Sequence, residues 1–156
     1  LLLARGLIHR PRLLLLDEPT VGLDPQIRTE LWRLIDGLRA EGTTILMSTH
    51  YIEEAERLAD EVAVMAAGRI IARAHPARLI EQHAGARTAE VYGPPERLRE
   101  LRREAERAGL AVRPAGPAIA VVGSERAPAG LIPEDAVERA GSLEDVFVLL
   151  TGEEVE

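Results

Sequence analysis

The sequence lacks both cysteine and lysine, and aromatic residues make up only 3% of it. Without cysteine the chain forms no disulfide, no thiolate metal site and no cysteine nucleophile. Without lysine it contains no phosphate-binding loop of the GxxxxGK[ST] type, whose lysine reaches the β- and γ-phosphates of a nucleotide. Long apolar runs are missing too. The longest covers residues 62–67, far short of the roughly 20 residues of a membrane-spanning helix. We also expect no secretory signal, because Arg5, His9 and Arg10 interrupt the leading leucines.

The composition is that of a globular chain with an acidic balance. Of its 156 residues, 46% are hydrophobic and 29% are charged, which excludes an intrinsically disordered chain. The formal net charge of −7 argues against general binding to nucleic acid or to anionic membranes. Proline is more frequent in the second part of the sequence, and the composition shifts near Gly85. We therefore predict two domains, residues 1–85 and residues 86–156.

The first part alternates short apolar runs with helical periodicity, a pattern typical of α/β architecture. Residues 13–16 are four consecutive leucines followed directly by acids, which predicts a strand buried on both faces. Asp24 precedes a proline and an apolar stripe of period 3.6, so we expect it to cap a helix. Residues 43–47 predict a second strand, and Ser48 or Thr49 can cap the helix that follows it.

The rest of the sequence predicts smaller elements. Two segments, residues 61–65 and 70–74, flank Ala66-Ala67-Gly68-Arg69, which indicates a hairpin. His75-Pro76 then opens a short helix that reaches about residue 83. Beyond Gly85 we expect strands, helices and one loop that together form a small α+β appendage. These are strands over residues 89–92 and 118–122, a charged helix over 96–108, a loop over 124–133 and a last helix capped by Ser142.

Polar residues follow both predicted strands of the first part. Asp17 and Glu18 follow the leucine run, and His50 follows the second strand. Open α/β sheets bind ligands at the carboxyl ends of their strands. One carboxylate there can hold Mg²⁺ through water, and another can accept a proton from an attacking water. Taken singly, these residues have plainer interpretations: a solvated acidic turn for Asp17 and Glu18, a surface residue for His50, a helix cap for Asp24, and packing or a partner surface for Trp32.

Together, these segments resemble a known family. Residues 13–24, reading LLLLDEPTVGLD, resemble the Walker B motif and D-loop of ATP-binding-cassette (ABC) ATPases. Residues 48–50 resemble the switch-histidine segment that follows in that family, and residues 3–7 with Pro11 are similar to the helix that precedes Walker B. The spacing of the pieces matches the family, so the combination is far more specific than an acidic pair. Residues 142–152 are similar to the end of drug-, polysaccharide- or nodulation-type exporter ATPases.

The resemblance implies a fold. Residues 1–85 would be part of a P-loop NTPase domain of ABC type with a mainly parallel sheet, and residues 86–156 would be a C-terminal α+β accessory domain. The family's P-loop, Q-loop and LSGGQ-like signature precede Walker B and have no counterpart in this sequence. We therefore expect this chain to correspond to the C-terminal half of a cassette and to be inactive as an ATPase on its own.

The resemblance also implies roles for particular residues. Asp17 would hold Mg²⁺, and Glu18 would polarise the attacking water as the general base. His50 would contact the γ-phosphate of ATP and stabilise its developing charge. Asp24 would lie at the interface of an ATPase dimer and couple its two ATP sites.

For the complete protein, the resemblance implies hydrolysis of Mg·ATP by a homodimer that drives a separate integral membrane permease. Export is the direction that the C-terminal similarity favours, and the location would be the cytoplasmic face of the cell membrane. We expect no nucleic-acid partner, because residues 96–107 interleave five arginines with four glutamates in a pattern typical of a solvated helix face. The alternatives are a non-transport ABC-type ATPase that acts on ribosomes or DNA, and a non-catalytic half-cassette that binds a partner.

Overall fold

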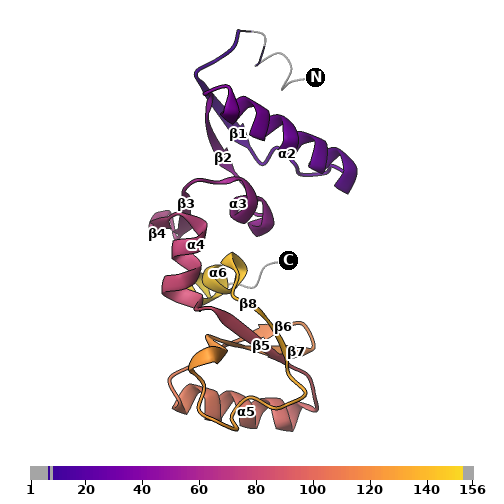
Figure 1. The fold of residues 1–156 in the computed structure, drawn as a ribbon, viewed down its shortest axis with the longest axis vertical. Helices are drawn as coiled ribbons and strands as arrows, with labels where there is room; N and C mark the ends of the chain where they lie inside the picture. The colour runs from indigo at the N-terminus through magenta and orange to yellow at the C-terminus, as the bar shows by residue number, and fades with distance from the viewer. Residues whose placement is uncertain (1–6, 8, 153–156) are drawn as a thin grey trace. The chain divides into compact units, whose positions relative to one another are not determined.

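The computed structural model describes residue 7 and residues 9–152 (Figure 1). This part of the chain divides into two compact units, one that ends at Leu58 and one that begins at Ala59. The helix expected at residues 3–7 from the family resemblance lies outside the described residues except for Leu7, which is helical. The boundary between two domains near residue 85, expected from the sequence, stays a prediction. Among the described residues, no helix is both long and apolar enough to cross a membrane.

The first unit is a parallel β-α-β arrangement followed by a helix. Its elements are β1 (Leu13–Asp17), α2 (Pro25–Ala40), β2 (Thr44–Ser48) and α3 (Ile52–Leu58). β1 and β2 pair in parallel, with α2 as the crossover between them (Figure 1). The register places Asp17, the last residue of β1, opposite Ser48, the last residue of β2. The predicted α/β fold class is therefore confirmed, and both strands end at the same edge.

The core of this unit lies on one face of the sheet. Trp32 and Ile35 of α2 and Leu58 of α3 are buried. The residues packed against them are Leu16, Leu31, Ile45 and Met47. On the opposite face Leu13, Leu15 and Leu46 are exposed by 56%, 66% and 66%. The prediction that the leucine strand is buried on both faces is therefore wrong for the described residues, because α2 and α3 cover only one face.

The second unit begins with a hairpin of β3 (Val62–Ala66) and β4 (Arg69–Ala74). Both turn residues have positive φ, 47° at Ala67 and 72° at Gly68, as a type I′ hairpin turn requires. The predicted hairpin is thus confirmed. The short helix after it is α4 (Pro76–Leu79), which continues as the π-helix η1 (Ile80–Ala84). The Nδ1 atom of His75 caps it by accepting a hydrogen bond from the amide of Ala77 at 3.2 Å.

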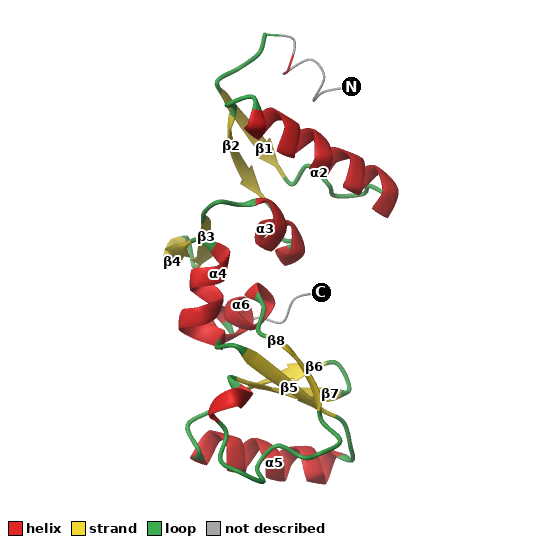
Figure 2. Cartoon of the chain, viewed as in Figure 1, coloured by secondary structure: helices red, strands yellow, loops and turns green. Residues whose placement is uncertain are grey.

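The rest of the second unit is an antiparallel sheet with helices (Figure 2). Its elements are β5 (Arg87–Val91), α5 (Pro95–Arg107), β6 (Ala111–Ala115), β7 (Ala118–Val122), the 3-10 turn η2 (Ser124–Arg126), β8 (Val137–Ala140) and α6 (Leu143–Thr151). The strand order is β6-β7-β5-β8, and every pair is antiparallel. This is the order of a split β-α-β fold in which a loop with η2 replaces the second crossover helix.

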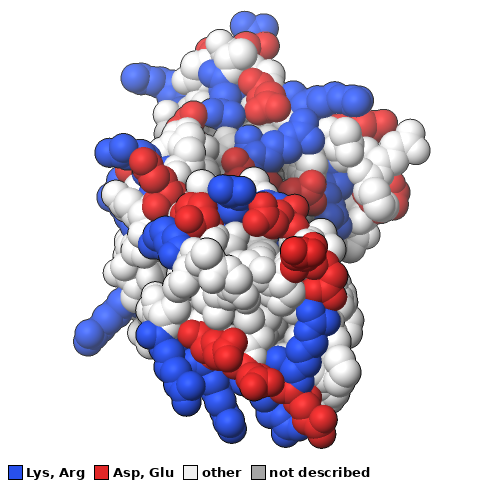
Figure 3. Space-filling model, turned by 60° about the horizontal axis from the view of Figure 1, so that its bottom comes forward, with Lys and Arg blue, Asp and Glu red and all other residues white. Residues whose placement is uncertain are grey.

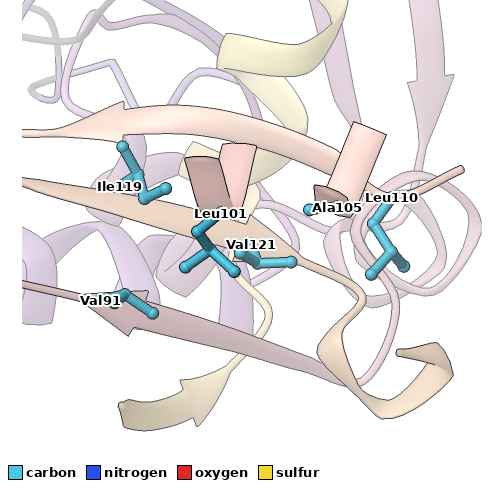
Figure 4. Close-up of a cluster of buried hydrophobic side chains, with 6 residues drawn as sticks. All are labelled: Val91, Leu101, Ala105, Leu110, Ile119 and Val121. Atoms are coloured by element: carbon cyan, nitrogen blue, oxygen red, sulfur yellow. The ribbon is translucent and has the colours of Figure 1, made fainter. Parts of the chain in front are cut away.

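One hydrophobic cluster holds α5 against this sheet (Figure 4). It consists of Val91, Leu101, Ala105, Leu110, Ile119 and Val121. Residues of the loop after η2 pack against the same cluster. α6 packs against η1 and β6. The predicted α+β appendage is thus confirmed, and the strands near 89–92 and 118–122 and the helix near 96–108 are present within a residue or two. β6 and β8 are not predicted from the sequence, and parallel pairing in the described residues is limited to β1 and β2.

Candidate functional site

Ser48 joins the carboxyl ends of the two parallel strands. Its hydroxyl donates a hydrogen bond to the carboxylate of Asp17. The amide of Glu18 donates to the carbonyl oxygen of Ser48 at 3.1 Å, and it also lies 3.1 Å from the Ser48 hydroxyl. One serine therefore fixes both the Asp17 carboxylate and the backbone of Glu18. The parallel register that pairs Asp17 with Ser48 makes this possible.

Glu18 has an unusual backbone conformation. Its φ of 43° lies in a region that few residues other than glycine adopt, and such conformations are concentrated at functional sites. The turn that follows is held by the amide of Val21, which donates to the Glu18 carbonyl oxygen at 3.3 Å. Leaving the strand in this way brings the Glu18 carboxylate to the end of β2.

Glu18 meets His50 there. The Oε1 atom of Glu18 lies 3.3 Å from Nδ1 of His50, and both side chains are about half exposed, at 50% and 56%. The ring of His50 also lies beside that of Tyr51, with the ring centres 4.3 Å apart. The structure thus brings Asp17, Glu18 and His50 to one edge of the sheet, where solvent and a ligand can reach them.

Asp24 is used as a helix cap. Its Oδ1 atom accepts hydrogen bonds from the amides of Gln26 and Ile27, both at 3.0 Å. Pro25 occupies the first turn of α2, so the N-terminus has the expected form. The Asp24 side chain is exposed. This cap accounts for Asp24 locally and leaves its surface free for a second role.

The donors at the strand ends are suited to a hard cation. The carboxylates of Asp17 and Glu18 and the hydroxyl of Ser48 are all oxygen ligands, which Mg²⁺ prefers. Among residues 7 and 9–152, no group of three or more histidine, cysteine or acidic side chains could hold a metal by itself. Mg²⁺ is commonly held by one or two carboxylates together with substrate phosphates. The residues present therefore fit a shared site for Mg²⁺ and a phosphate, not a closed protein cage.

Sequence reasoning missed a buried acid behind this site. Glu54 of α3 is 0% exposed. Its Oε1 accepts a hydrogen bond from Nε1 of Trp32 at 3.1 Å, and its Oε2 accepts one from the hydroxyl of Thr49 at 2.8 Å. Ser48 and Thr49 are thus used differently from the helix caps expected of them. A signal was available, since Glu54 precedes Leu58 by four residues and therefore lies on the same face of its helix.

The chain matches a family model over residues 1–54. The model is described as "AAA domain, putative AbiEii toxin, Type IV TA system". The match agrees with the predicted P-loop NTPase type of α/β fold for the first unit. The matched residues include β1, α2 and β2. They also include all four predicted site residues, Asp17, Glu18, Asp24 and His50.

Over its whole length, the chain is similar to proteins named Nod factor export ATP-binding protein I. It is 40% identical over 169 residues to the protein of Bradyrhizobium sp. (strain SNU001), and 41% identical over 169 residues to that of Rhizobium johnstonii. It is 41% identical over 164 residues to that of Ralstonia nicotianae. These alignments cover 99–100% of this chain and 51–52% of each relative. The chain therefore spans about half the length of the curated relatives it matches, and the predicted resemblance to exporter ATP-binding subunits is confirmed.

Proposed function

We propose that this chain is part of an ATP-binding and ATP-hydrolysing subunit of an ABC exporter. The observation that carries the proposal is the similarity to export ATP-binding proteins over 99–100% of the chain, which includes the appendage as well as the first unit. A non-transport ATPase or a non-catalytic module would share the first unit without need of the exporter-type end. The juxtaposition of Asp17, Glu18 and His50 supports a catalytic role for the site.

In the proposed reaction, the oxygen of a water molecule attacks the γ-phosphorus of ATP. The bond between that phosphorus and the bridging oxygen breaks, so the products are ADP and inorganic phosphate. Glu18 takes the proton of the attacking water as general base. His50 donates a hydrogen bond to the γ-phosphate oxygens, on which charge develops. The distance of 3.3 Å between Glu18 and His50 is consistent with both side chains facing one phosphoryl group.

Asp17 is the proposed ligand of Mg²⁺. Its carboxylate is oriented by the Ser48 hydroxyl, which leaves its remaining lone pairs for water molecules around the ion. When bound, Mg²⁺ would neutralise charge on the β- and γ-phosphates. Without it, two neighbouring carboxylates at this edge repel a triphosphate.

The proposed partners are a second copy of the ATPase subunit and an integral membrane permease. Asp24 would lie at the interface between the copies, since its exposed surface is free beyond its role as a cap. The protein would then be located at the cytoplasmic face of the membrane. We expect no nucleic-acid partner; on the face drawn in Figure 3, acidic and basic side chains are intermixed.

The test is phosphate release from Mg·ATP by the complete gene product that carries this chain. Glu18→Gln keeps the shape of the side chain and removes the base. Because general-base catalysis contributes about 10²–10⁴ in rate, turnover should fall by that factor while ATP still binds. Glu30→Gln, the same change at an exposed position of α2, is the matched control and should leave turnover as in the wild type. Wild-type turnover in Glu18→Gln would contradict the role of Glu18.

A further inference from the structure

The segment that carries His50 is attached to the first unit at both of its ends. Before His50, the Thr49 hydroxyl donates to the Glu54 carboxylate at 2.8 Å. After it, the amide of Tyr51 donates to the same Thr49 hydroxyl at 3.0 Å, and the Tyr51 carbonyl oxygen accepts from the amide of Glu54 at 3.0 Å. Residues 49–51 are therefore closed into a small hydrogen-bonded ring with Glu54, and His50 lies at its exposed tip.

The helix α2 supports this ring from the core. The indole Nε1 of Trp32 donates to Glu54 at 3.1 Å, and Trp32 is itself buried. The guanidinium of Arg28 lies 4.5 Å from the ring centre of Tyr51, within the range of a cation–π contact. α2 thus contacts this hydrogen-bonded segment at two residues that follow His50, Tyr51 and Glu54. Asp24 caps the N-terminus of α2. The contacts of α2 with Tyr51 and Glu54 therefore connect the Asp24 segment with the segment that carries His50.

A carboxylate is the side chain that fits between these donors. Each of its oxygens accepts a hydrogen bond, and it has no donor of its own. Glutamine has only one acceptor oxygen, so with Trp32 bonded to that oxygen its N–H₂ group would face the Thr49 hydroxyl, which would have to accept instead of donate. A buried carboxylate is costly unless it is hydrogen-bonded. Burying Glu54 would therefore be unfavourable if the side chain only filled space in the core. Instead, both of its oxygens accept hydrogen bonds, from Trp32 and from Thr49.

We propose that Glu54 is a positioning residue for His50, holding it through Thr49 and Tyr51 so that its imidazole faces Glu18 and the reacting phosphate. This inference rests on the proposed ATPase function for its catalytic part. It makes no claim that Glu54 touches substrate. Misplacement of a catalytic group by about 1 Å can cost up to about 10²-fold in rate, so an indirect effect of Glu54 is measurable.

The catalytic part is tested in the complete gene product with Glu54→Gln. We expect kcat to fall about tenfold or more, with KM for ATP changed less than about twofold. Glu53→Gln, the same change at the exposed neighbour on α3, is the control and should keep the wild-type kcat. In a His50→Ala background, Glu54→Gln should have no further effect on kcat. An equal fall in both backgrounds would show that Glu54 does not act through His50 and would overturn the proposal.

A second measurement does not depend on ATP hydrolysis. Amide hydrogen exchange at Tyr51 should become at least about tenfold faster in Glu54→Gln, while amides of β1 and β2 keep wild-type exchange. Unchanged exchange at Tyr51 would overturn the proposal. If the wild-type protein hydrolyses no ATP, the proposed function fails, and this measurement still decides whether Glu54 holds the segment.

Thr49 supplies a variant that leaves the buried carboxylate in place, in case Glu54→Gln does not fold. Thr49→Val removes the hydroxyl that joins Glu54 to Tyr51 and keeps the volume of the side chain. It should lower kcat and speed exchange at Tyr51 as Glu54→Gln does. Thr49→Ser restores the hydroxyl and should recover most of the rate. Equal activity of the Val and Ser variants would overturn the proposal.

Discussion

The buried carboxylate of Asp145 makes a specific prediction about the stability of the second unit. Asp145 is 0% exposed. Its Oδ1 accepts hydrogen bonds from Arg113 at 2.7 Å and from Arg139 at 2.8 Å. Its Oδ2 accepts from Arg139 at 2.8 Å, from the Thr88 hydroxyl at 2.9 Å and from the Ser142 amide at 3.1 Å. Asp145→Asn keeps the shape and removes the charge that these donors share.

The loss of stability in Asp145→Asn depends on which ion pairs Arg113 and Arg139 retain. Removing one partner of a buried ion pair costs about 3–5 kcal/mol. Arg113 keeps Glu144 at 3.2 Å, and Arg139 keeps Glu90 at 2.7 Å, so the lower end of that range applies. A loss of about 3 kcal/mol in the free energy of unfolding is a large part of the 5–15 kcal/mol of a typical domain. Glu144→Gln is the control, since this side chain is 47% exposed and Arg113 keeps its bond to Asp145, so a loss of only about 0–1 kcal/mol is expected.

Amide hydrogen exchange at β5 and β7 is the appropriate assay, because a chain of two units need not unfold in one step. At about 1.4 kcal/mol for each factor of ten, exchange of these amides should be roughly 100-fold faster in Asp145→Asn. In Glu144→Gln it should be within about fivefold of the wild type. Exchange in Asp145→Asn within fivefold of the wild type would refute the energetic argument.

The same group determines a dependence on pH. Burial alone would raise the pKa of Asp145, but hydrogen bonds from Arg139 and Arg113 outweigh it and hold the pKa well below its ordinary range. The folded-state pKa is thus below the unfolded value of about 3.9. The stabilisation is therefore fully present above about pH 4 and is lost as the pH falls below it. The difference between the wild type and Asp145→Asn should be constant from pH 5 to about pH 8 and should shrink only in acid.

Two further predictions concern backbone packing and nucleotide binding. A Cβ atom on Gly141 would lie under 3.0 Å from the carbonyl oxygen of Gly85. Gly141→Ala should therefore lower the stability of the second unit by about 1–3 kcal/mol in a denaturant titration. Gly37→Ala is the control and should not destabilise the protein, because an added Cβ there meets nothing within 4 Å. The 156-residue chain by itself lacks lysine and any glycine-rich phosphate loop, so isothermal titration with Mg·ATP should show no binding, and a micromolar dissociation constant would contradict the proposal that other residues supply most of the nucleotide site.

The first unit could be predicted from the sequence because its signals are local. Four leucines directly before an acidic pair predict a strand with a polar end, and Asp24 before a proline predicts a capped helix start. These signals are enough to place Asp17, Glu18 and His50 at one edge, since parallel strands end together. The partners of the site are not local. Ser48 and Glu54 act through hydrogen bonds to residues that lie 31 and 22 positions away, Asp17 and Trp32, and no spacing rule indicates them.

The second unit is harder to predict because its edge strands are polar. β8 reads Val-Glu-Arg-Ala and β6 contains Arg113 and Pro114, a composition that favours loops over strands. Neither segment alternates apolar and polar residues as a half-buried strand does. The loop predicted over residues 124–133 is largely correct. Its composition indicates a loop, and the structure has only the short 3-10 turn η2 there.

Arg113 of β6 and Arg139 of β8 explain why these edges nevertheless form. The two strands are the opposite edges of the sheet, yet both arginines bind the one carboxylate of Asp145. Thr88 of β5 binds it as well, and Ser142 with Asp145 forms the capping box that starts α6. A single buried acid therefore satisfies donors from both edges, from a central strand and from a helix start. Burial of the Asp145 carboxylate without those donors would be unfavourable, so the four elements must assemble together. Arg113 and Arg139, whose charges favour a loop when each segment is considered alone, thus make the contacts that hold the edge strands in the sheet.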